Sequence, residues 1–408
     1  MVFAFDQYNK SAMHHWGHHI IRITHHPLTW VMICLVIIAG LGVWWMIEKT
    51  VQVSSTTEAP FMLEQEGITV FSPVPIHISR PQEVRGLYWT IVTAGNTRSD
   101  ELLSYMLSLG LNAVVVDLKM DNGWLGFSPN EESLQVYVSH ISVIEDLDAR
   151  LTHWGEQGVY RIARIAVMRD GALATARPDL ALFTDNGSLW QDAIGSLWVD
   201  PAAIEVAEYA INLGREAYER GFDEIQFDYV RFPSDGTISS ALYPIYNGLE
   251  DKNEIMGHFF ERVGGTLRAE GIPVSFDVFG MICLREDGFG IGQRLVDVLP
   301  FTDFLSPMVY PSHYPEGFEG FANPALYPYE VVKDSLDACI TQAVAQGLGT
   351  QEEMAEKFRP WLQDFDIGAV YTANLIEAQI QASRDAGASG WMLWNARNVY
   401  EPAEYEEE

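Results

Sequence analysis

The chain has 408 residues, of which 48% are hydrophobic and 20% are charged, a composition typical of a packed globular protein. Its 56 acidic side chains exceed its 25 basic ones, and the resulting charge of −31 opposes binding to the phosphates of a nucleic acid. Three cysteines are too few for a disulfide-rich scaffold, and no glycine-rich phosphate-binding loop is present, so we expect no nucleotide cofactor.

Residues 28–47 form an uncharged apolar segment. As a helix these 20 residues span about 30 Å, the thickness of the hydrocarbon core of a bilayer. Trp30, Trp44 and Trp45 lie near its ends, where tryptophan favours the headgroup region. The segment is longer than the apolar region of a signal peptide and no cleavage motif follows it, so we predict an uncleaved single-pass membrane anchor. A signal peptide and a buried core helix are the alternatives.

The tail before this segment, residues 1–27, predicts its orientation. Lys10 and Arg22 lie there, so the positive-inside rule favours a cytoplasmic tail and an extracytoplasmic remainder. The tail also holds histidines at i, i+4 spacing, which is compatible with metal binding or simply with a polar segment beside the membrane. These are His14, His15, His18, His19, His25 and His26. We assign no metal and no activity to them.

A linker, one large domain and a short acidic tail follow the anchor. Residues 48–80 mix Ser, Thr, Pro and Glu without a sustained period, and residues 401–408 are mostly acidic. Residues 81–400 alternate short apolar runs with amphipathic stretches, the pattern of repeated βα units. The predicted strands are 86–91, 113–118, 160–167, 224–230, 274–279, 304–310, 361–365 and 391–396. The predicted helices are 100–109, 144–157, 202–220, 253–270, 329–346 and 373–386. This order predicts a (β/α)8 TIM barrel, with a doubly wound open sheet as the alternative.

Carboxylates stand near the ends of two predicted neighbouring strands. Side chains alternate along a strand, so the apolar Ile225 and Phe227 take the outward face and Asp228 points into the barrel. Gln226 shares this inward face. The same alternation points Asp277 inward from the fifth strand, toward the end where barrel active sites are built.

Asp228 and Asp277 are the predicted catalytic pair. Burial and mutual proximity push the pKa values of two such carboxyl groups apart, so that one serves as acid and the other as base or nucleophile. Hydrolysis of a glycosidic bond needs this division of roles across the bond that breaks.

Two further polar residues are predicted near this pair. Asp117 points inward from the second strand, and Arg231 follows Asp228 by three residues, where it positions either that carboxylate or the substrate. The structural alternative is that these aspartates cap helices or pair with Arg164, Arg231 or Arg397.

Aromatic residues cluster at or just beyond the predicted strand ends. Sugar rings pack their C–H faces on flat aromatic side chains, and their hydroxyls bond to groups such as Asn395 and Gln226. We predict Trp89 and Trp391 as such platforms, whereas Trp394 has the opposite parity and is expected to fill the core. The full set is Tyr88, Trp89, Trp124, Tyr310, Tyr314, Trp391 and Trp394.

Other hydrolase chemistries have less support. The first strand carries no paired histidines, and no Gly-x-Ser-x-Gly motif occurs, so neither a metal-dependent amidohydrolase nor a serine hydrolase is indicated. Cys283 and Cys339 are either a disulfide formed outside the cytoplasm or two buried thiols, and the sequence leaves both open.

Seven segments together resemble one family. The longest is GFDEIQFDYVRFPSD at residues 221–235, which is similar to the signature of the bacterial "putative glycosyl hydrolase domain" family of TIM-barrel glycoside hydrolases. The others are RGLYW (85–89), VSFDVFG (274–280), GIGQ (290–293), SPMVYPSHY (306–314), RPWLQDF (359–365) and GWMLWNA (390–396). The resemblance implies a (β/α)8 fold and a carbohydrate substrate. It supports Asp228 and Asp277 as motif carboxylates and implies that Tyr310, His313 and Asp364 line the site.

These observations predict a membrane-anchored glycoside hydrolase that acts on a polysaccharide or oligosaccharide of the envelope or its surroundings. The alternative is a non-catalytic glycan-binding or envelope-organising protein that keeps the barrel as a scaffold. The acidic charge disfavours heavily anionic polymers and suits neutral or amino-sugar chains, although a surface charged for solubility explains it equally well.

Overall fold

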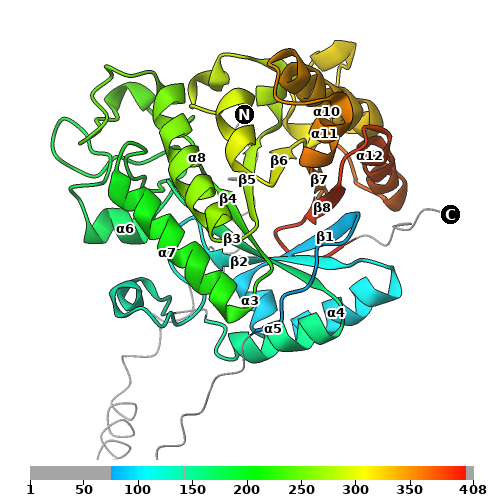
Figure 1. The fold of residues 1–408 in the computed structure, drawn as a ribbon. Coiled ribbons are helices and arrows are strands. Elements are labelled where there is room, and N and C mark those ends of the chain that lie inside the picture. Colours follow the sequence, from blue (N-terminus) through cyan, green and yellow to red (C-terminus); the bar gives the residue numbers. More distant parts are fainter. Residues whose placement is uncertain (1–74, 141–142, 401–408) are drawn as a thin grey trace, which may run out of the picture. The chain divides into compact units, whose positions relative to one another are not determined.

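Eight parallel strands surround the centre of the computed structural model, which describes residues 75–140 and 143–400 (Figure 1). Each strand pairs with the next in chain order, and the eighth pairs with the first, so the sheet is closed. The strands are β1 (Val84–Trp89), β2 (Ala113–Lys119), β3 (Tyr160–Ala166), β4 (Glu224–Asp228), β5 (Val274–Phe279), β6 (Phe304–Met308), β7 (Trp361–Gln363) and β8 (Gly390–Trp394). The predicted (β/α)8 barrel is confirmed, and the closure excludes the open sheet.

Helices between the strands cover the outer face of the barrel (Figure 1). The longer ones are α4 (Arg98–Ser108), α5 (Leu147–Glu156), α7 (Ile204–Arg220), α8 (Lys252–Ala269), α10 (Pro328–Ala345) and α12 (Ala373–Asp385). The shorter ones are α3 (Ile91–Ala94), α6 (Gly171–Ala176), α9 (Leu295–Val298) and α11 (Gln351–Lys357). All six predicted helices are present, whereas the four short ones were not predicted.

Helix α7 illustrates why these segments are helical. Val206, Ala210, Leu213 and Ala217 recur at intervals of three or four residues and are all buried, so one apolar stripe faces the sheet. The helix ends at Gly221, whose φ of +115° a residue with a Cβ rarely adopts. The chain then turns directly into β4.

Five of the predicted strands, the first, fourth, sixth, seventh and eighth, end two residues earlier in the structure than predicted. The first strand ends at Trp89 instead of residue 91, because Thr90 caps α3 by accepting a hydrogen bond from the N–H of Thr93. The sixth strand ends at Met308 rather than at Tyr310, whose backbone already leads into a 3₁₀ turn. These turns follow the C-terminal ends of the strands, where the candidate site lies.

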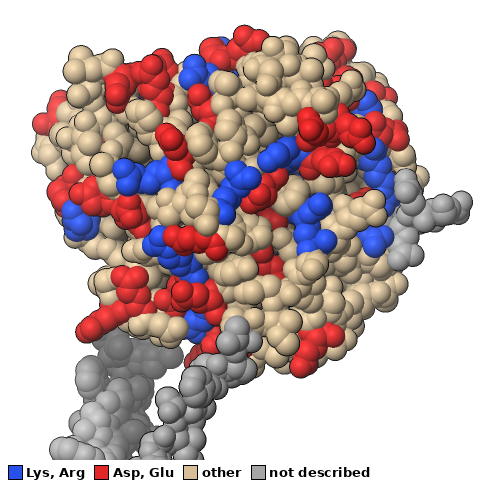
Figure 2. All heavy atoms as spheres, in the orientation of Figure 1, with Lys and Arg blue, Asp and Glu red and all other residues tan. Residues whose placement is uncertain are grey.

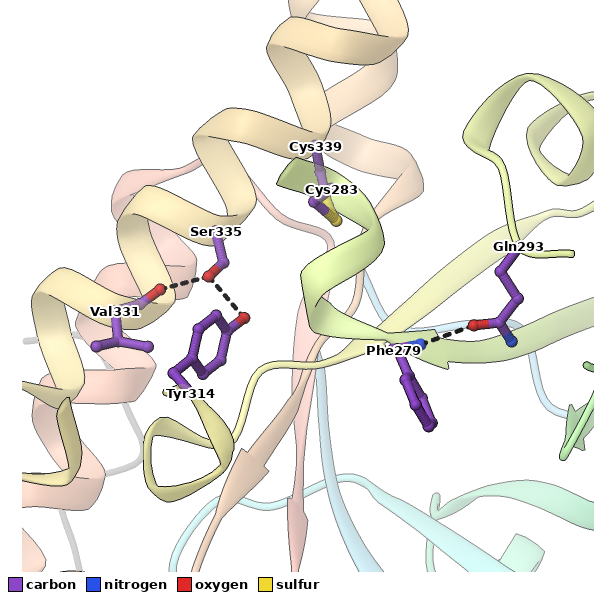
Figure 3. Close-up of a disulfide and its surroundings, with 7 residues drawn as sticks. All are labelled: Phe279, Cys283, Gln293, Tyr314, Val331, Ser335 and Cys339. Atoms are coloured by element: carbon purple, nitrogen blue, oxygen red, sulfur yellow. Dashed lines mark hydrogen bonds between the residues drawn. A yellow bond between two sulfur atoms is a disulfide. The ribbon is translucent and has the colours of Figure 1, made fainter. Parts of the chain in front are cut away.

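A disulfide between Cys283 and Cys339 ties the segment after β5 to α10 (Figure 3). Cys283 lies in the 3₁₀ turn Gly280–Leu284, and both cysteines are buried. Beside the disulfide, Ser335 Oγ donates to the Val331 carbonyl at 2.7 Å and shares a 2.7 Å hydrogen bond with the Tyr314 hydroxyl (Figure 3). Of the two states that the sequence left open for the cysteines, the structure has the disulfide.

The surface carries acidic side chains with basic ones between them on the face drawn in Figure 2. Within residues 75–140 and 143–400, no helix combines the length and the apolar character needed to cross a bilayer. The predicted anchor at 28–47 and the tails 1–27 and 401–408 lie outside the described residues, as does most of the linker 48–80. The membrane anchor therefore stays a prediction.

Candidate active site

Asp228 and Asp277 lie side by side at the C-terminal ends of β4 and β5. Phe227 and Phe276 are paired in the register of these two strands, and the two aspartates follow them by one residue each. Because Phe227 and Phe276 pack outward under the helices, both aspartates point into the barrel, as predicted.

One guanidinium, that of Arg164 on β3, meets three carboxylates at this end of the barrel. Its Nη1 donates to Asp117 at 2.6 Å, its Nη2 donates to Asp228, and its Nε lies 3.8 Å from Oδ2 of Asp277. The pairing with Arg164 that we gave as the structural alternative is therefore present. This pairing does not balance the charge of the cluster, however, because three ionised carboxylates would surround the single positive charge of Arg164.

Protonation relieves this imbalance. Burial, followed by the charge of Asp228, raises the pKa of Asp277 well above its usual range. Only 1% of Asp277 is exposed, and its Oδ2 has no hydrogen-bond partner, whereas its Oδ1 accepts from Trp361 Nε1 at 2.8 Å. Protonation of Asp277 is therefore favoured next to Asp228, which is 7% exposed and ion-paired.

Asp117 is the third carboxyl group of the cluster and is 8% exposed. Burial raises its pKa too, although Arg164 and a 2.9 Å hydrogen bond from the Tyr88 hydroxyl act in the opposite direction. Tyr88 stacks on Trp394 with 3.9 Å between ring centroids, and the Arg164 guanidinium lies 5.1 Å from the Trp394 ring. Tyr88 and Trp394 thus form an aromatic wall beside the carboxylates.

The sixth-strand loop brings Tyr310 and His313 to the same end of the barrel. Burial raises the pKa of Tyr310, and the neighbouring carboxyl groups of Asp277 and Asp228 raise it further. His313 contacts Tyr310 edge-on with 5.4 Å between ring centroids, and burial lowers its pKa to about 4, so its imidazole is neutral at pH 7. The structure therefore brings these two predicted residues together with the carboxylate pair.

Three other predicted contact residues have structural partners instead. Gln226 is fully buried two residues below Asp228 and donates to Ser306 Oγ at 3.2 Å across the barrel interior. Asn395 donates to the backbone carbonyls of Asp364 and Val399, which holds the loop after β8. Asp364 is 2% exposed, and its charge acts on the buried Tyr400. Their roles in binding a ligand stay predictions.

The two predicted tryptophan platforms lie on the wrong face. Trp89 and Trp391 are fully buried between the sheet and the helices, where Trp89 contacts Trp154 edge-on and Trp391 donates to Glu83 at 3.2 Å. The expectation for β8 was therefore inverted, because Trp394 faces the barrel interior and Trp391 faces outward.

Of the residues that organise the cluster, sequence reasoning missed Trp361. It named Arg164 only in the structural alternative, and Tyr88 and Trp394 only as members of the aromatic set. Arg164 and Trp361 each contact a predicted carboxylate, and Tyr88 and Trp394 complete the wall. The available signal for Arg164 was its place in the middle of a strand whose only other charged residue is Arg161, because a buried charge needs a partner.

Arg231 follows Asp228 and lies among aromatic rings, 4.5 Å from the Phe279 ring and 4.9 Å from the Trp198 ring.

Among the described residues, no group of three or more His, Cys, Asp or Glu side chains is arranged to hold a metal ion. The histidines between His14 and His26 lie outside the described residues.

A family model described as "putative glycosyl hydrolase domain" matches residues 86–400, which include all the elements of this site except the first residues of β1. The chain belongs to this family. No curated protein matches the sequence.

Several solved structures are similar to the chain. A hypothetical protein from Ruminiclostridium thermocellum is 30% identical, with a TM-score of 0.42, over 50% of this chain and 98% of that one. The PgaB (BpsB) glycoside hydrolase domain from Bordetella bronchiseptica is 14% identical, with a TM-score of 0.52, over 77% of this chain and 94% of its own. Alpha-L-fucosidase isoenzyme 2 from Paenibacillus thiaminolyticus is 17% identical, with a TM-score of 0.51, over 76% of this chain and 46% of the fucosidase. The last two likenesses show a shared barrel fold.

Proposed function

We propose that this protein is a glycoside hydrolase that cleaves a polysaccharide or oligosaccharide with Asp228 and Asp277. The observation that carries the proposal is the cluster of three carboxyl groups on Arg164, in which burial raises the pKa of Asp277 beside the ion-paired Asp228. Family membership supports the reaction class, and the position at the C-terminal ends of barrel strands is where such sites are built.

In the proposed reaction, the protonated Asp277 donates its proton to the glycosidic oxygen as the bond from that oxygen to the anomeric carbon breaks. Asp228 supplies the electron pair, either by attacking the anomeric carbon or by taking a proton from the attacking water. The charge of Asp228 also stabilises the positive charge that develops on the sugar ring. Tyr88 and Trp394 offer flat faces against which a sugar ring packs.

The experiment uses the full-length protein in a detergent without a sugar headgroup, incubated with a panel of polysaccharides and assayed for new reducing ends. We expect Asp228→Asn to lower hydrolysis by at least about 10³-fold while glycan binding and the circular dichroism spectrum stay unchanged. Equal turnover by Asp228→Asn and the wild type would reject the assignment. Binding without product on every glycan would favour the non-catalytic alternative.

A second set of variants identifies the acid. Burial raises the pKa values of both Asp277 and Asp117. Asp277 is the more deeply buried of the two, at 1% exposed against 8% for Asp117. An acid variant regains activity on a substrate whose leaving group needs no proton, such as a dinitrophenyl glycoside. We expect this regain with Asp277→Asn and not with Asp117→Asn, and the opposite result would move the role to Asp117.

We also propose that the domain is extracytoplasmic and held by the predicted anchor at residues 28–47. The Cys283–Cys339 disulfide supports an oxidising compartment, because such bonds are rare in the cytosol. Thiol labelling of the denatured protein taken from cells should require prior reduction at these cysteines. Labelling without reduction would contradict this placement.

A further inference from the structure

Arg231, just after β4, is a buried cation without a carboxylate partner. Its side chain is 6% exposed, and no Asp or Glu oxygen of the described residues lies within 4 Å of its guanidinium. Its Nη1 donates to the Phe232 carbonyl at 3.1 Å and to Ser234 Oγ at 3.1 Å. Its Nε and Nη2 have no hydrogen-bond partner among the described residues.

The neighbouring arginines show that this is unusual at this end of the barrel. Arg164 has its three aspartates, and Arg169 pairs with Asp121 at 2.8 Å and with Asp192 at 3.2 Å. Arg231 is as deeply buried as these two and carries the same charge. A buried arginine whose Nε and Nη2 donors are unused can donate to an anion that the protein itself does not supply.

Aromatic rings hold the guanidinium in place instead of neutralising it. The carbon of the guanidinium lies 4.5 Å from the centroid of Phe279, 4.9 Å from that of Trp198 and 5.6 Å from that of Tyr229. Phe279 ends β5, two residues after Asp277, so Arg231 lies between the ends of the two strands that carry the catalytic pair. Burial lowers the pKa of Arg231, which reflects the cost of keeping this cation out of water.

We propose that Arg231 binds an anionic substituent of the glycan, a carboxylate, sulfate or phosphate, on a sugar next to the bond that is cleaved. The position relative to that bond rests on the proposed function, whereas the anion site itself does not. The planar guanidinium, with Nε and Nη2 side by side, suits two hydrogen bonds to two oxygens of one such group.

The chemistry of the reaction favours this arrangement. Positive charge develops on the sugar ring in the transition state of glycoside hydrolysis. An unpaired guanidinium close enough to interact with Asp228 would oppose that charge, and a bound anion would cancel the effect. The overall charge of −31 still disfavours polymers with an anion on every sugar, so the site suits glycans in which such groups are sparse.

Matched pairs of glycans test the proposal by binding, which does not depend on turnover. Each pair consists of the same oligosaccharide with and without its anionic group: uronate against carboxyl-reduced, sulfated against desulfated, and phosphorylated against dephosphorylated. We expect the full-length wild-type protein to bind the anionic member of at least one pair about tenfold more tightly or better. The pair that shows the preference identifies the anion. Equal binding within every pair would overturn the proposal without any variant.

Variants then attribute the preference to the residue. Arg231→Gln should remove it, Arg231→Lys should keep part of it, and Arg177→Gln should leave it unchanged. Arg177→Gln is the control because it removes the same charge from an exposed guanidinium, which pairs with Asp179 at the surface. A preference that survives Arg231→Gln would overturn the proposal even if the protein hydrolyses glycans. A preference that Arg231→Gln removes would uphold it even if no glycan is hydrolysed.

Discussion

The two ends of the barrel interior are both built on a buried arginine, but only one end is balanced. At the base, Arg359 donates to Glu224, and both side chains are fully buried. Tyr160 and Ser275 also donate to Glu224, so one cation and one carboxylate share a closed network. At the mouth, a single arginine faces three carboxyl groups, two of which retain some contact with solvent.

This difference separates a stabilising ion pair from a reactive site. A one-to-one pair, in which the carboxylate accepts from Arg359, Tyr160 and Ser275, fixes how the strands meet. An unbalanced cluster holds a proton that it can give away, which costs stability and provides chemistry. In barrels of this kind the base contributes to stability and the mouth to function.

The largest effect on stability is expected at the base. Glu224→Gln leaves the buried charge of Arg359 without its partner and should lower the free energy of unfolding by about 3–5 kcal/mol. Activity per folded molecule should stay unchanged. Denaturant titration measures the first quantity, and Glu270→Gln is the control, because its exposed pair with Arg215 is worth at most about 1 kcal/mol. A loss of activity without a loss of stability would place Glu224 in the site.

The two tryptophans of β8 sharpen the comparison between inside and outside. Trp391→Ala empties the outer core and should lower the free energy of unfolding by about 3 kcal/mol, with little effect on glycan affinity. Trp394→Ala should lower glycan affinity about tenfold at a smaller cost in stability, because its ring is only partly buried in the interior wall. Titration of each variant with a glycan measures affinity, and titration with denaturant measures stability. If Trp391→Ala lost affinity and Trp394→Ala lost stability, the sequence-based prediction of Trp391 as the sugar platform would be correct after all.

The smallest effect is a gain in stability at the mouth. The pKa of Asp277 is raised in the folded protein, so above its ordinary value of 3.8 the unfolded chain loses this proton while the folded protein keeps it. Stability is therefore lost as the pH rises from that value toward the raised pKa. Asp277→Asn abolishes the titration and should stabilise the protein by on the order of 1 kcal/mol at pH 7 and not at pH 3. Thermal unfolding at both pH values checks this, and lower stability of the variant at pH 7 would contradict it.

Alternation along the strands was enough to predict where the carboxylates point. In β4 and β5 the apolar positions alternate with polar ones, so only one face can be buried under helices. In β8 every residue after Gly390 is apolar, and alternation carries no signal. Only the pairing of Gly86 with Met392 in the closed sheet decides which tryptophan faces inward. A tertiary contact determined what the local pattern could not.

The sequence named Arg164 as a partner of the aspartates but could not say which aspartates it meets. Arg164, Asp117 and Asp228 come from three successive strands, and their contact depends on the stagger of those strands around the barrel. The alternation in β3 is enough to predict that Arg164 faces inward. Which aspartates it meets depends on the register of β3 with β2 and β4. The resemblance to a family supplied the region and the fold, and the geometry supplied the network.

The disulfide has a consequence for a protein exposed to proteases. Cys283 and Cys339 are 56 residues apart, and the stretch between them includes exposed residues such as Glu316 and Gly317, which are accessible to a protease. A single cut there would leave the two pieces covalently joined. Cys339 on α10 would still be bonded to Cys283, which lies in the turn after β5, the strand that carries Asp277. The cleaved chain would migrate as one band until reductant is added, and its barrel would stay assembled around the nick.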